Sequence, residues 1–350
     1  MGLKIGLIGC GTVGTGLLEI LDRKREQLKD AYDFEPKVVA ISDLHKGSIL
    51  VPDGIELKQM LSILKEGKRI DQYYGEGKTA ELLNPLDMIE TCEADIIAEL
   101  SYTDIKTGEP ATSYIKKAFR TGMHVVTSNK GPAALYYHEL KRMADQNKLF
   151  FRIEGTVMSG TPVFSLFESG LAGNEIREVK GILNGTTNFI LTKMEQEGMD
   201  YAEALRLAQK LGYAEADPTA DVQGYDAVAK VVILSNVLLG GSLTPEDVRR
   251  EGITSLTKEQ ILAAKAQGSR YKLIAQTRRT GDRIEASVSP QKLPLSDPLA
   301  GIMGAQNALT FDLDLMGKIT IQGAGAGKTE TGYSILVDML AIQRSLKNRS

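Results

Sequence analysis

The stretch LKIGLIGCGTVG, residues 3–14, decides the fold of the N-terminal half. Residues 3–8 are mostly apolar and predict a short buried strand, and residues 12–31 carry the spacing of a helix. Between them lies a GxGxxG pattern, in which the first glycine makes a tight turn, the second lets the backbone approach a pyrophosphate, and the third lets helix and strand pack. The helix start then offers free N–H groups to phosphates. The candidate cofactor-binding residues here are Gly9, Gly11, Thr12, Val13 and Gly14.

The alternation of strand and helix continues along the first 148 residues. It predicts an α/β fold with a Rossmann-type parallel sheet and right-handed crossovers. For the glycine pattern, a strand-to-helix turn without any ligand is the alternative. The expected strands after the first are residues 37–42, 95–100 and 124–127, and the expected helices are residues 111–121 and 133–147.

From residue 149 the pattern changes, and it predicts a second domain of the α+β class. We expect a dinucleotide-binding domain at residues 1–148, completed by the C-terminal helix within 329–350, and a substrate-binding and catalytic domain at 149–328. The elements expected in the later part of the chain are helices at 162–171, 188–197, 200–211, 221–239 and 330–346, a polar helix-forming stretch at 243–268, and strand-like runs at 283–288 and 317–322.

The composition is that of a globular protein of 350 residues with 42% hydrophobic residues, enough for two domain cores. A net charge of −3 and a pI of about 5.8 argue against general binding of nucleic acid or an anionic membrane. The two cysteines, Cys10 and Cys92, form neither a CxxC pair nor a zinc spacing. We recognise no signal peptide and no apolar run of membrane length, and we expect a cytoplasmic protein.

Asp43 ends the second expected strand and is the candidate for binding the ribose hydroxyls of a dinucleotide. An acidic residue at this place favours NAD. His45 and Lys46 follow at once, however, and a basic pair can meet the 2′-phosphate of NADP. The residues therefore leave the choice between NAD and NADP open, and a solvated loop aspartate is the alternative role for Asp43.

Asp226 and Lys230 are four residues apart, which on a helix places both side chains on one face. Such pairs usually lie on the surface and contribute little. Here, residues 227–229 and 231–234 are all apolar, which predicts a buried helix. Because a buried lysine is costly unless it is paired or used, the pattern favours a catalytic role for Asp226 and Lys230.

Three further segments carry candidate residues. The turn beginning at Glu215 can face a cationic substrate group, or it is an ordinary acidic helix flank. The run LNGTTN at 183–188 suits a small polar ligand or caps a helix, and its candidates are Asn184, Gly185 and Thr186. Lys130 follows an expected strand at the edge where open α/β sheets bind ligands, with a solvent lysine as the alternative.

A second glycine cluster at residues 323–329 resembles a P-loop, but Gln322 stands where that motif begins with glycine. We expect a turn that returns the chain to the first domain. Within it, Gly325 is the candidate for a cofactor contact, and a purely structural turn is the alternative.

Taken together, four motifs resemble the homoserine dehydrogenase family, and the resemblance covers essentially the whole chain. The last two motifs are highly specific. The resemblance implies reversible, NAD- or NADP-dependent reduction of L-aspartate-4-semialdehyde to L-homoserine, a step of threonine, methionine and isoleucine biosynthesis. The motifs are GxGTVG at 9–14, SNKGP at 128–132, GILNGTTNFIL at 181–191 and GYAEADPTADVQGYDAVAK at 212–230.

The resemblance also implies roles for individual residues. Lys230 would be the general acid, and Lys130 would lie beside substrate and nicotinamide and share that role. Asp226 would bind the substrate and orient Lys230, while Glu215 would bind the substrate amino group. Ser101, after the strand at 95–100, would lie near the nicotinamide.

Members of the family also carry a monovalent cation, usually sodium, and are usually homodimers joined through the substrate domain. By resemblance, the cation ligands would be Glu154 and the backbone of Val157, Ser159 and Thr161. Many members add a C-terminal ACT domain or a fused kinase, and we expect a monofunctional member without them.

Three alternatives stay open from the residues alone. A semialdehyde dehydrogenase would need a cysteine nucleophile, but Cys10 lies in the glycine loop and Cys92 before a sheet strand. A non-catalytic dinucleotide sensor would have no need for a buried Asp226–Lys230 pair. Another nicotinamide-dependent dehydrogenase of a small amino-acid-like substrate would use the same residues.

Overall fold

The computed structural model describes residues 2–74 and 84–349. The chain divides into two compact units, the first made of Met1–Gly160 and Gly327–Ser350 and the second of Thr161–Ala326. Among the described residues, no helix combines the length and hydropathy that a membrane span requires.

The first unit is built on a six-stranded sheet in the order β3-β2-β1-β4-β5-β6, parallel except for the edge strand β3. This confirms the predicted Rossmann-type sheet. Since the chain leaves the central strand β1 toward β2 on one side and β4 on the other, the carboxyl ends of β1 and β4 form the crevice where such sheets bind ligands. The strands are β1 (Lys4–Ile8), β2 (Lys37–Asp43), β3 (Gly47–Leu50), β4 (Ile96–Glu99), β5 (His124–Thr127) and β6 (Phe151–Arg152).

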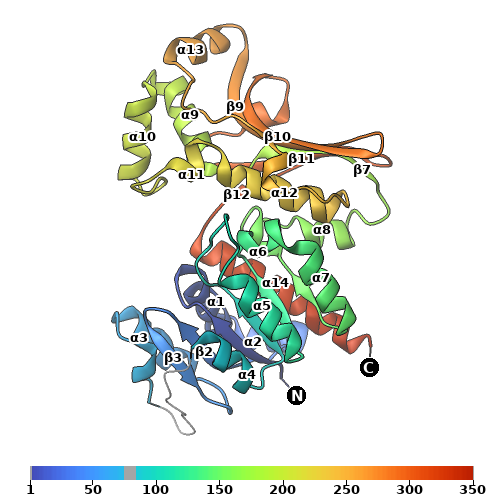
Figure 1. Cartoon of the computed structure of the whole chain (residues 1–350). Helices are drawn as coiled ribbons and strands as arrows, with labels where there is room; N and C mark the ends of the chain where they lie inside the picture. The colour runs from blue at the N-terminus through green and yellow to red at the C-terminus, as the bar shows by residue number, and fades with distance from the viewer. Residues whose placement is uncertain (1, 75–83, 350) are drawn as a thin grey trace. The chain divides into compact units, whose positions relative to one another are not determined.

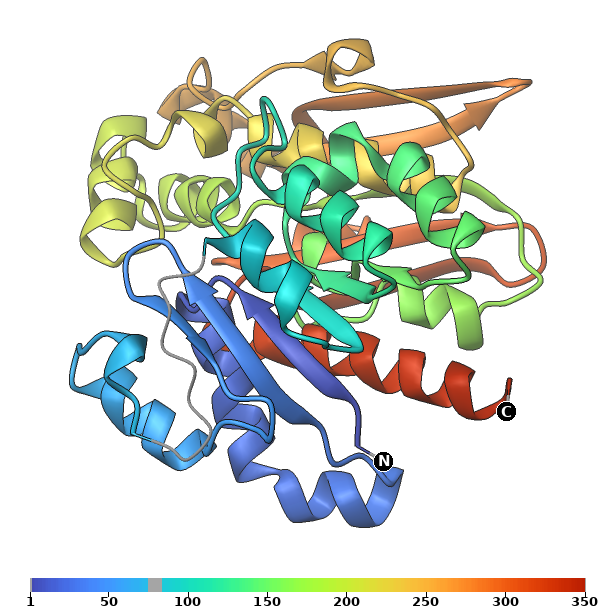
Figure 2. The same cartoon turned by 60° about the horizontal axis from the view of Figure 1, so that its bottom comes forward.

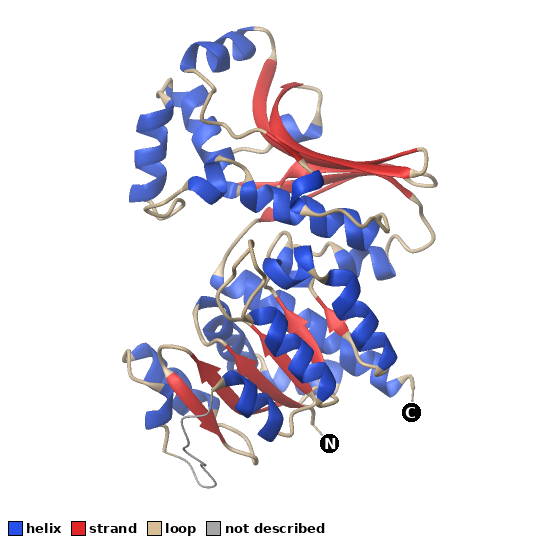
Figure 3. Ribbon diagram, in the orientation of Figure 1, coloured by secondary structure: helices blue, strands red, loops and turns tan. Residues whose placement is uncertain are grey.

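Helices cover both faces of this sheet, as Figure 3 shows with strands in red and helices in blue. The expected helix over 12–31 is wrong in one respect: it is two helices, because the backbone leaves helical geometry at Lys24 (φ −104°, ψ 9°). The second helix buries only Leu28. The helices are α1 (Thr12–Arg23), α2 (Arg25–Tyr32), α3 (Leu57–Lys65), α4 (Pro85–Thr91), α5 (Ala111–Arg120), α6 (Lys130–Leu135), α7 (Tyr137–Gln146) and α14 (Lys328–Lys347), with single turns η1 (Ile70–Gln72) and η2 (Glu154–Thr156).

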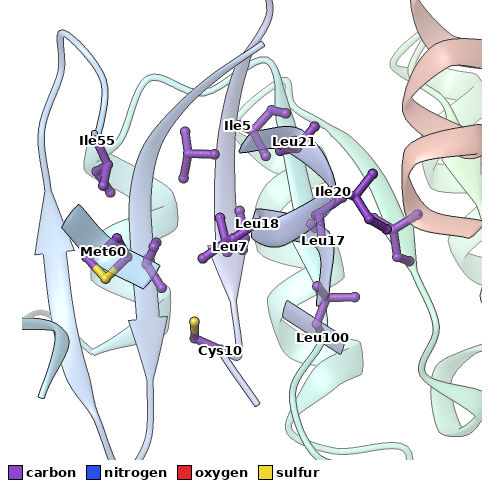
Figure 4. Close-up of a cluster of buried hydrophobic side chains, with 14 of the residues drawn as sticks. Ile5, Leu7, Cys10, Leu17, Leu18, Ile20, Leu21, Ile55, Met60 and Leu100 are labelled. Carbon is purple, nitrogen blue, oxygen red and sulfur yellow. The ribbon is translucent and has the colours of Figure 1, made fainter. Parts of the chain in front are cut away.

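The core of this unit lies between β1 and α1, where Ile5 and Leu7 face Leu17, Leu18 and Leu21 (Figure 4). These side chains are all less than 5% exposed. On burial, each fully apolar side chain of this size contributes about 1.5–3 kcal/mol. The glycine loop that follows β1 is therefore anchored at both ends by the best-buried part of the unit.

The C-terminal helix α14 packs against α1, as Figure 1 and Figure 2 both show. The approach is close at Gly16, where a Cβ atom would lie 2.2 Å from the carbonyl oxygen of Lys328. A glycine is therefore required on this face of α1. The segment that closes the first unit comes from the far end of the sequence.

The second unit is built on another six-stranded sheet, in the order β12-β11-β7-β9-β10-β8, antiparallel except for the short strand β8. With its helices it confirms the predicted α+β class. The strands are β7 (Ile176–Ile182), β8 (Arg249–Arg250), β9 (Ser269–Thr280), β10 (Arg283–Pro294), β11 (Gln306–Leu313) and β12 (Gly317–Ala324).

Helix α12 packs against β9 and β10 of this sheet (Figure 1), and the hydroxyls of Ser235 and Thr277 meet at 2.8 Å. Ile274, on the opposite face of β9, belongs to a second apolar cluster with η4. The expected polar helix over 243–268 is mostly wrong, because the chain there forms a turn, β8 and a loop before α13. The helical elements are α8 (Phe164–Ser169), α9 (Gly185–Glu197), α10 (Tyr201–Lys210), α11 (Thr219–Val222), α12 (Tyr225–Leu238), α13 (Lys258–Ala266), η3 (Pro245–Asp247) and η4 (Pro298–Gly301).

A buried lysine in this sheet makes the stability of the second unit depend on pH. Lys272 on β9 is 1% exposed, and its amine donates to Asn188 Oδ1 at 2.8 Å and to the carbonyl of Ile302. Burial lowers the pKa of Lys272 from 10.5 to about 8, against the opposing charge of Glu195. Between these two values the unfolded chain binds more protons than the folded chain, so the free energy of unfolding rises with pH.

We therefore expect Lys272 to add about 2 kcal/mol to the free energy of unfolding, measured in urea, between about pH 7.5 and pH 9.5. The variant Lys272→Met should lose this gain, because methionine does not titrate. Lys193→Met, which removes a half-exposed lysine of α9, is the matched control and should keep it. Equal pH dependence in wild type and Lys272→Met would contradict the assignment.

Candidate active site

The loop after β1 holds two glycines in different environments. Gly9 has φ +95°, and a Cβ atom there would lie 2.3 Å from the carbonyl oxygen of Leu100. At Gly11, the N-cap of α1, a Cβ atom would meet no described atom within 4 Å. No side chain caps α1, so its first N–H groups face this open space. The loop thus has the form that accepts a pyrophosphate at a helix N-terminus.

Asp43 lies at the end of β2, as predicted, and ties the glycine loop to the turn between β2 and β3. Its Oδ2 accepts a hydrogen bond from the Cys10 N–H at 2.8 Å, and its Oδ1 accepts from the N–H groups of His45 and Lys46 at 3.0 and 3.1 Å. Burial alone would raise the pKa of Asp43, but these three N–H groups hold it below its ordinary value. Asp43 is therefore a fixed, ionised acceptor beside the loop.

A cavity of about 760 Å³ opens in the first unit beside these residues. Its walls include Gly11, Asp43, Leu44 and Ser101. Volumes of this size accommodate cofactors and other small molecules. The sequence placed Gly11, Asp43 and Ser101 in a cofactor site from separate segments, and the fold brings all three to one cavity.

A buried carboxyl that the sequence analysis missed lies behind Ser101. Glu99 is 0% exposed, and its Oε1 accepts hydrogen bonds from the N–H and the hydroxyl of Ser101. Thr127 Oγ1 lies 2.9 Å from Glu99 Oε2. Burial raises the pKa of Glu99, although these hydrogen bonds oppose the shift. Only its position at the end of an apolar strand marks Glu99 in the sequence.

Lys130 follows β5, as the sequence predicted, and begins α6; the helix expected over 133–147 is two helices, α6 and α7, and starts three residues earlier. The side chain of Asn129 caps this helix by accepting from the Gly131 N–H at 3.1 Å, and its Nδ2 donates to the carbonyl of Tyr102 at 3.1 Å. The loops after β4 and β5 are thereby joined, and the start of the helix that carries Lys130 is fixed.

In the second unit, Lys230 and Asp226 form the buried pair that the sequence predicted on α12. Lys230 Nζ lies 2.8 Å from Asp226 Oδ2 and donates to the carbonyl of Leu183 at 2.6 Å. The two side chains are 8% and 13% exposed. A cation held this far from water interacts strongly with any anion that reaches it.

Asn184 links this pair to a second carboxylate. Its Nδ2 donates to Asp221 Oδ1 at 2.7 Å and to Asp226 Oδ2 at 3.0 Å, while its Oδ1 caps α9 by accepting from the Thr187 N–H at 2.9 Å. Asp221 is partly buried, and desolvation raises its pKa. The helix therefore begins at Gly185 and not at 188 as expected, because Asn184 caps it.

The sequence analysis assigned no role to Asp221. The only available signal was a third acidic residue inside the motif at 212–230, five positions before Asp226. Thr186 supports the same cluster, because its hydroxyl donates to the carbonyl of Tyr213 at 2.6 Å.

Two other candidate residues have contacts of a different kind. Glu215 is exposed on a turn, and its backbone carbonyl accepts from Gln209 at 3.2 Å. Gly325 packs on Asn307, whose Cγ would lie 2.3 Å from a Cβ atom there, so close packing explains this glycine.

The proposed cation ligands begin with Glu154, which is 2% exposed in η2 and whose N–H donates to Asp338 at 2.9 Å. Val157 and Ser159 follow it and are buried, whereas Thr161 is the first residue of the second unit. The described residues contain no group of three or more metal-binding side chains.

The fold and the two sites define the class of protein. A Rossmann-type sheet with an open glycine loop, followed by a unit with a buried lysine–carboxylate pair, is the architecture of an NAD(P)-dependent oxidoreductase. The family profile "Homoserine dehydrogenase, NAD binding domain" matches residues 9–154, and the profile "Homoserine dehydrogenase" matches residues 162–340. The chain belongs to the homoserine dehydrogenase family.

Relatives of nearly equal length carry the same name. The chain is 44% identical to the NAD(+)-dependent homoserine dehydrogenase of Pseudomonas canavaninivorans, over 98% of this chain and 96% of the relative. It is 39% identical to the homoserine dehydrogenase of Methanocaldococcus jannaschii, over 99% of this chain and 100% of the relative.

Solved structures of homoserine dehydrogenases superpose on this chain over nearly its full length. A putative homoserine dehydrogenase from Archaeoglobus fulgidus superposes with a TM-score of 0.86 at 39% identity, covering 97% of this chain and 99% of the other. A hyperthermophilic archaeal homoserine dehydrogenase in complex with NADPH superposes with a TM-score of 0.83 at 29% identity, covering 99% and 98%.

Proposed function

We propose that this protein catalyses the reversible NAD(P)H-dependent reduction of L-aspartate-4-semialdehyde to L-homoserine. The observation that carries the proposal is the buried Lys230–Asp226 pair, 2.8 Å apart, inside one of the two highly specific motifs and within the segment that matches the family profile. The same pair argues against a sensor, because a sensor has no use for a buried charge that is costly to maintain.

The mechanism assigns a distinct task to each of these side chains. The nicotinamide cofactor supplies the hydride, and the carbonyl oxygen of the aldehyde gains negative charge as its carbon is reduced. The Lys230 ammonium stabilises this charge and donates the proton that completes the alcohol. Asp226 keeps the amine in place, and the Leu183 carbonyl fixes its direction. In the oxidative direction the same amine receives the proton.

Lys130 shares the electrostatic role from its place at the start of α6. Glu215 binds the substrate amino group, and Asp226 hydrogen-bonds the substrate. Asn184, Gly185 and Thr186 complete the substrate pocket. Asp221 joins this set, because it shares the Asn184 amide with Asp226. A carboxylate-rich pocket of this kind complements an ammonium group.

The glycine loop and Asp43 would hold the dinucleotide, with the pyrophosphate at the N-terminus of α1 and a ribose at Asp43. Gly11 supports this assignment, since the space in front of it is open. Ser101 and Gly325 complete the proposed cofactor contacts. Whether NAD or NADP is preferred is decided by direct comparison in the assay below.

A monovalent cation, a homodimer and a cytoplasmic location complete the proposal. The cation would be held at Glu154 and the backbone of Val157, Ser159 and Thr161, where a buried carboxylate is followed by a turn that includes Ser159 at φ +53°. The homodimer would form through the second unit.

The test is an absorbance assay of homoserine oxidation with NAD+ and with NADP+ in turn. We expect reduced cofactor to appear with homoserine, and not with serine or threonine at equal concentration. Cofactor binding without turnover would favour the non-catalytic sensor.

The alternative of a semialdehyde dehydrogenase is disfavoured, because such an enzyme needs a cysteine thiolate as nucleophile. Burial raises the pKa of the Cys10 thiol to about 11 and also raises the pKa of Cys92, so both thiols stay protonated near neutral pH.

A further inference from the structure

A segment outside the catalytic motif braces the turn between the two carboxylates that share Asn184. This brace comprises Arg249–Thr254, which begins with β8. Strand β8 pairs with β10, where Arg250 lies opposite Val288. The brace is therefore attached through β8 to the sheet of the second unit, and not to the helices that carry the catalytic residues.

Arg250 makes three contacts with the turn that joins α11 to α12. Its Nη1 donates to the carbonyl of Gln223 at 2.5 Å, and its Nη2 donates to the Tyr225 hydroxyl at 3.1 Å. Its guanidinium carbon also lies 4.0 Å from the centroid of the Tyr225 ring. Hydrogen bonding and stacking by one planar group fix both position and orientation.

The backbone of the brace holds the other side of the turn. The Ile253 N–H donates to the carbonyl of Val222 at 2.9 Å, and Gln223 Nε2 donates to Thr254 Oγ1 at 3.3 Å. At Gly252, a Cβ atom would lie 2.4 Å from the Val222 carbonyl oxygen. Residues 222–225 are thus contacted at every position by the brace or by β10, since Gly224 lies under Val288.

Within its own segment, the turn is held by backbone hydrogen bonds such as that from the Gly224 N–H to the Asp221 carbonyl at 2.9 Å. Gly224 is the N-cap of α12 at φ +83°, and no side chain caps this helix start. Asp221 precedes the turn and Asp226 follows it. A movement of residues 222–225 would shift Asp226, the partner of Lys230, relative to Asp221 and strain the hydrogen bonds by which Asn184 joins the two carboxylates.

We propose that Arg250 is a positioning residue of the active site. It sets the separation of Asp221 and Asp226 by clamping the turn between them, without touching the substrate. This inference rests on the proposed function, because it assumes that both carboxylates serve the same substrate.

The test compares Arg250→Ala with Arg249→Ala, since Arg249 is the neighbouring residue on β8 and is exposed like Arg250. We expect Arg250→Ala to lower kcat/KM for homoserine about tenfold, through both kcat and the KM for homoserine, because misplacing a catalytic group is costly even at a distance. The KM for the cofactor and the Tm should stay near the wild-type values. Arg249→Ala should behave as the wild type in every measurement.

Two further variants separate positioning from general stability. Arg250→Lys keeps the charge but not the planar group, so we expect it to recover less than half of the lost activity. Tyr225→Phe removes one acceptor, and combined with Arg250→Ala it should cost less than the sum of the two changes. If Arg250→Ala matches Arg249→Ala, or if activity falls only in step with Tm, the inference is wrong. A wild type without homoserine activity would instead overturn the proposed function itself.

Discussion

The variant Lys230→Ala should lower kcat for homoserine oxidation by about 100-fold or more, the usual scale for losing a general acid–base. The reason is that the ammonium group is the cation that the second unit holds beside Asp226, at 2.8 Å and 8% exposed. Alanine removes both the proton donor and the charge that stabilises the developing oxyanion. Cofactor affinity should not change, because the glycine loop and Asp43 belong to the other unit. The measurements are steady-state kinetics in both directions and the Kd of the reduced cofactor by fluorescence.

A matched control lies on α9, where Lys193 forms the same i,i+4 pair with Glu197 but with side chains 25% and 42% exposed. Lys193→Ala should leave kcat unchanged and alter stability by less than about 0.5 kcal/mol. Since Lys230→Ala also leaves Asp226 without its cation, a fall in Tm is compatible with the mechanism. A kcat within threefold of the wild type, in protein with a normal Kd for the cofactor, would remove Lys230 from the mechanism.

The second large effect is expected in the glycine loop, where two chemically identical changes should have opposite consequences. Gly11→Ala should weaken cofactor binding at least about tenfold, because the new methyl group occupies the space in front of the α1 N–H groups. Its Tm should stay within about 2 °C of the wild type, since nothing described lies within 4 Å of the added atom.

Gly9→Ala should instead destabilise the first unit by about 3 kcal/mol or more. Its Cβ atom would lie 2.3 Å from the Leu100 carbonyl oxygen, and its φ of +95° is unfavourable for alanine. Thermal unfolding and cofactor titration of the two variants distinguish the roles. If Gly11→Ala binds the cofactor normally, the pyrophosphate does not lie at this helix start.

Much of the first unit could be predicted because its signals are local. The strands at 37–42 and 124–127 are short apolar runs, and the glycine loop marks the point where strand gives way to helix. The edge strand β3 and the short β6 were not predicted, because each depends on pairing with a neighbour and carries little pattern of its own.

The residues of the candidate site likewise include some that local sequence patterns predicted and some that they did not. The Asp226–Lys230 pair was predictable, since four residues of helix bring the side chains together and the apolar neighbours imply burial. Asp221 and Glu99 were missed because their contacts join segments far apart in the sequence. Asn184 and Asp221 are 37 positions apart in the sequence, and Thr127 and Glu99 are 28 positions apart. The periodicity of a single helix or strand does not reveal contacts between residues so far apart.

The contact between α1 and α14 has a consequence for biosynthesis. Because α14 is encoded after the whole of the second unit, the first 160 residues leave the ribosome well before the helix that completes their unit has been synthesised. The α1 surface around Gly16, which α14 covers in the folded protein, cannot be covered by α14 during that interval. The N-terminal unit can therefore complete its fold only after the second unit has been synthesised.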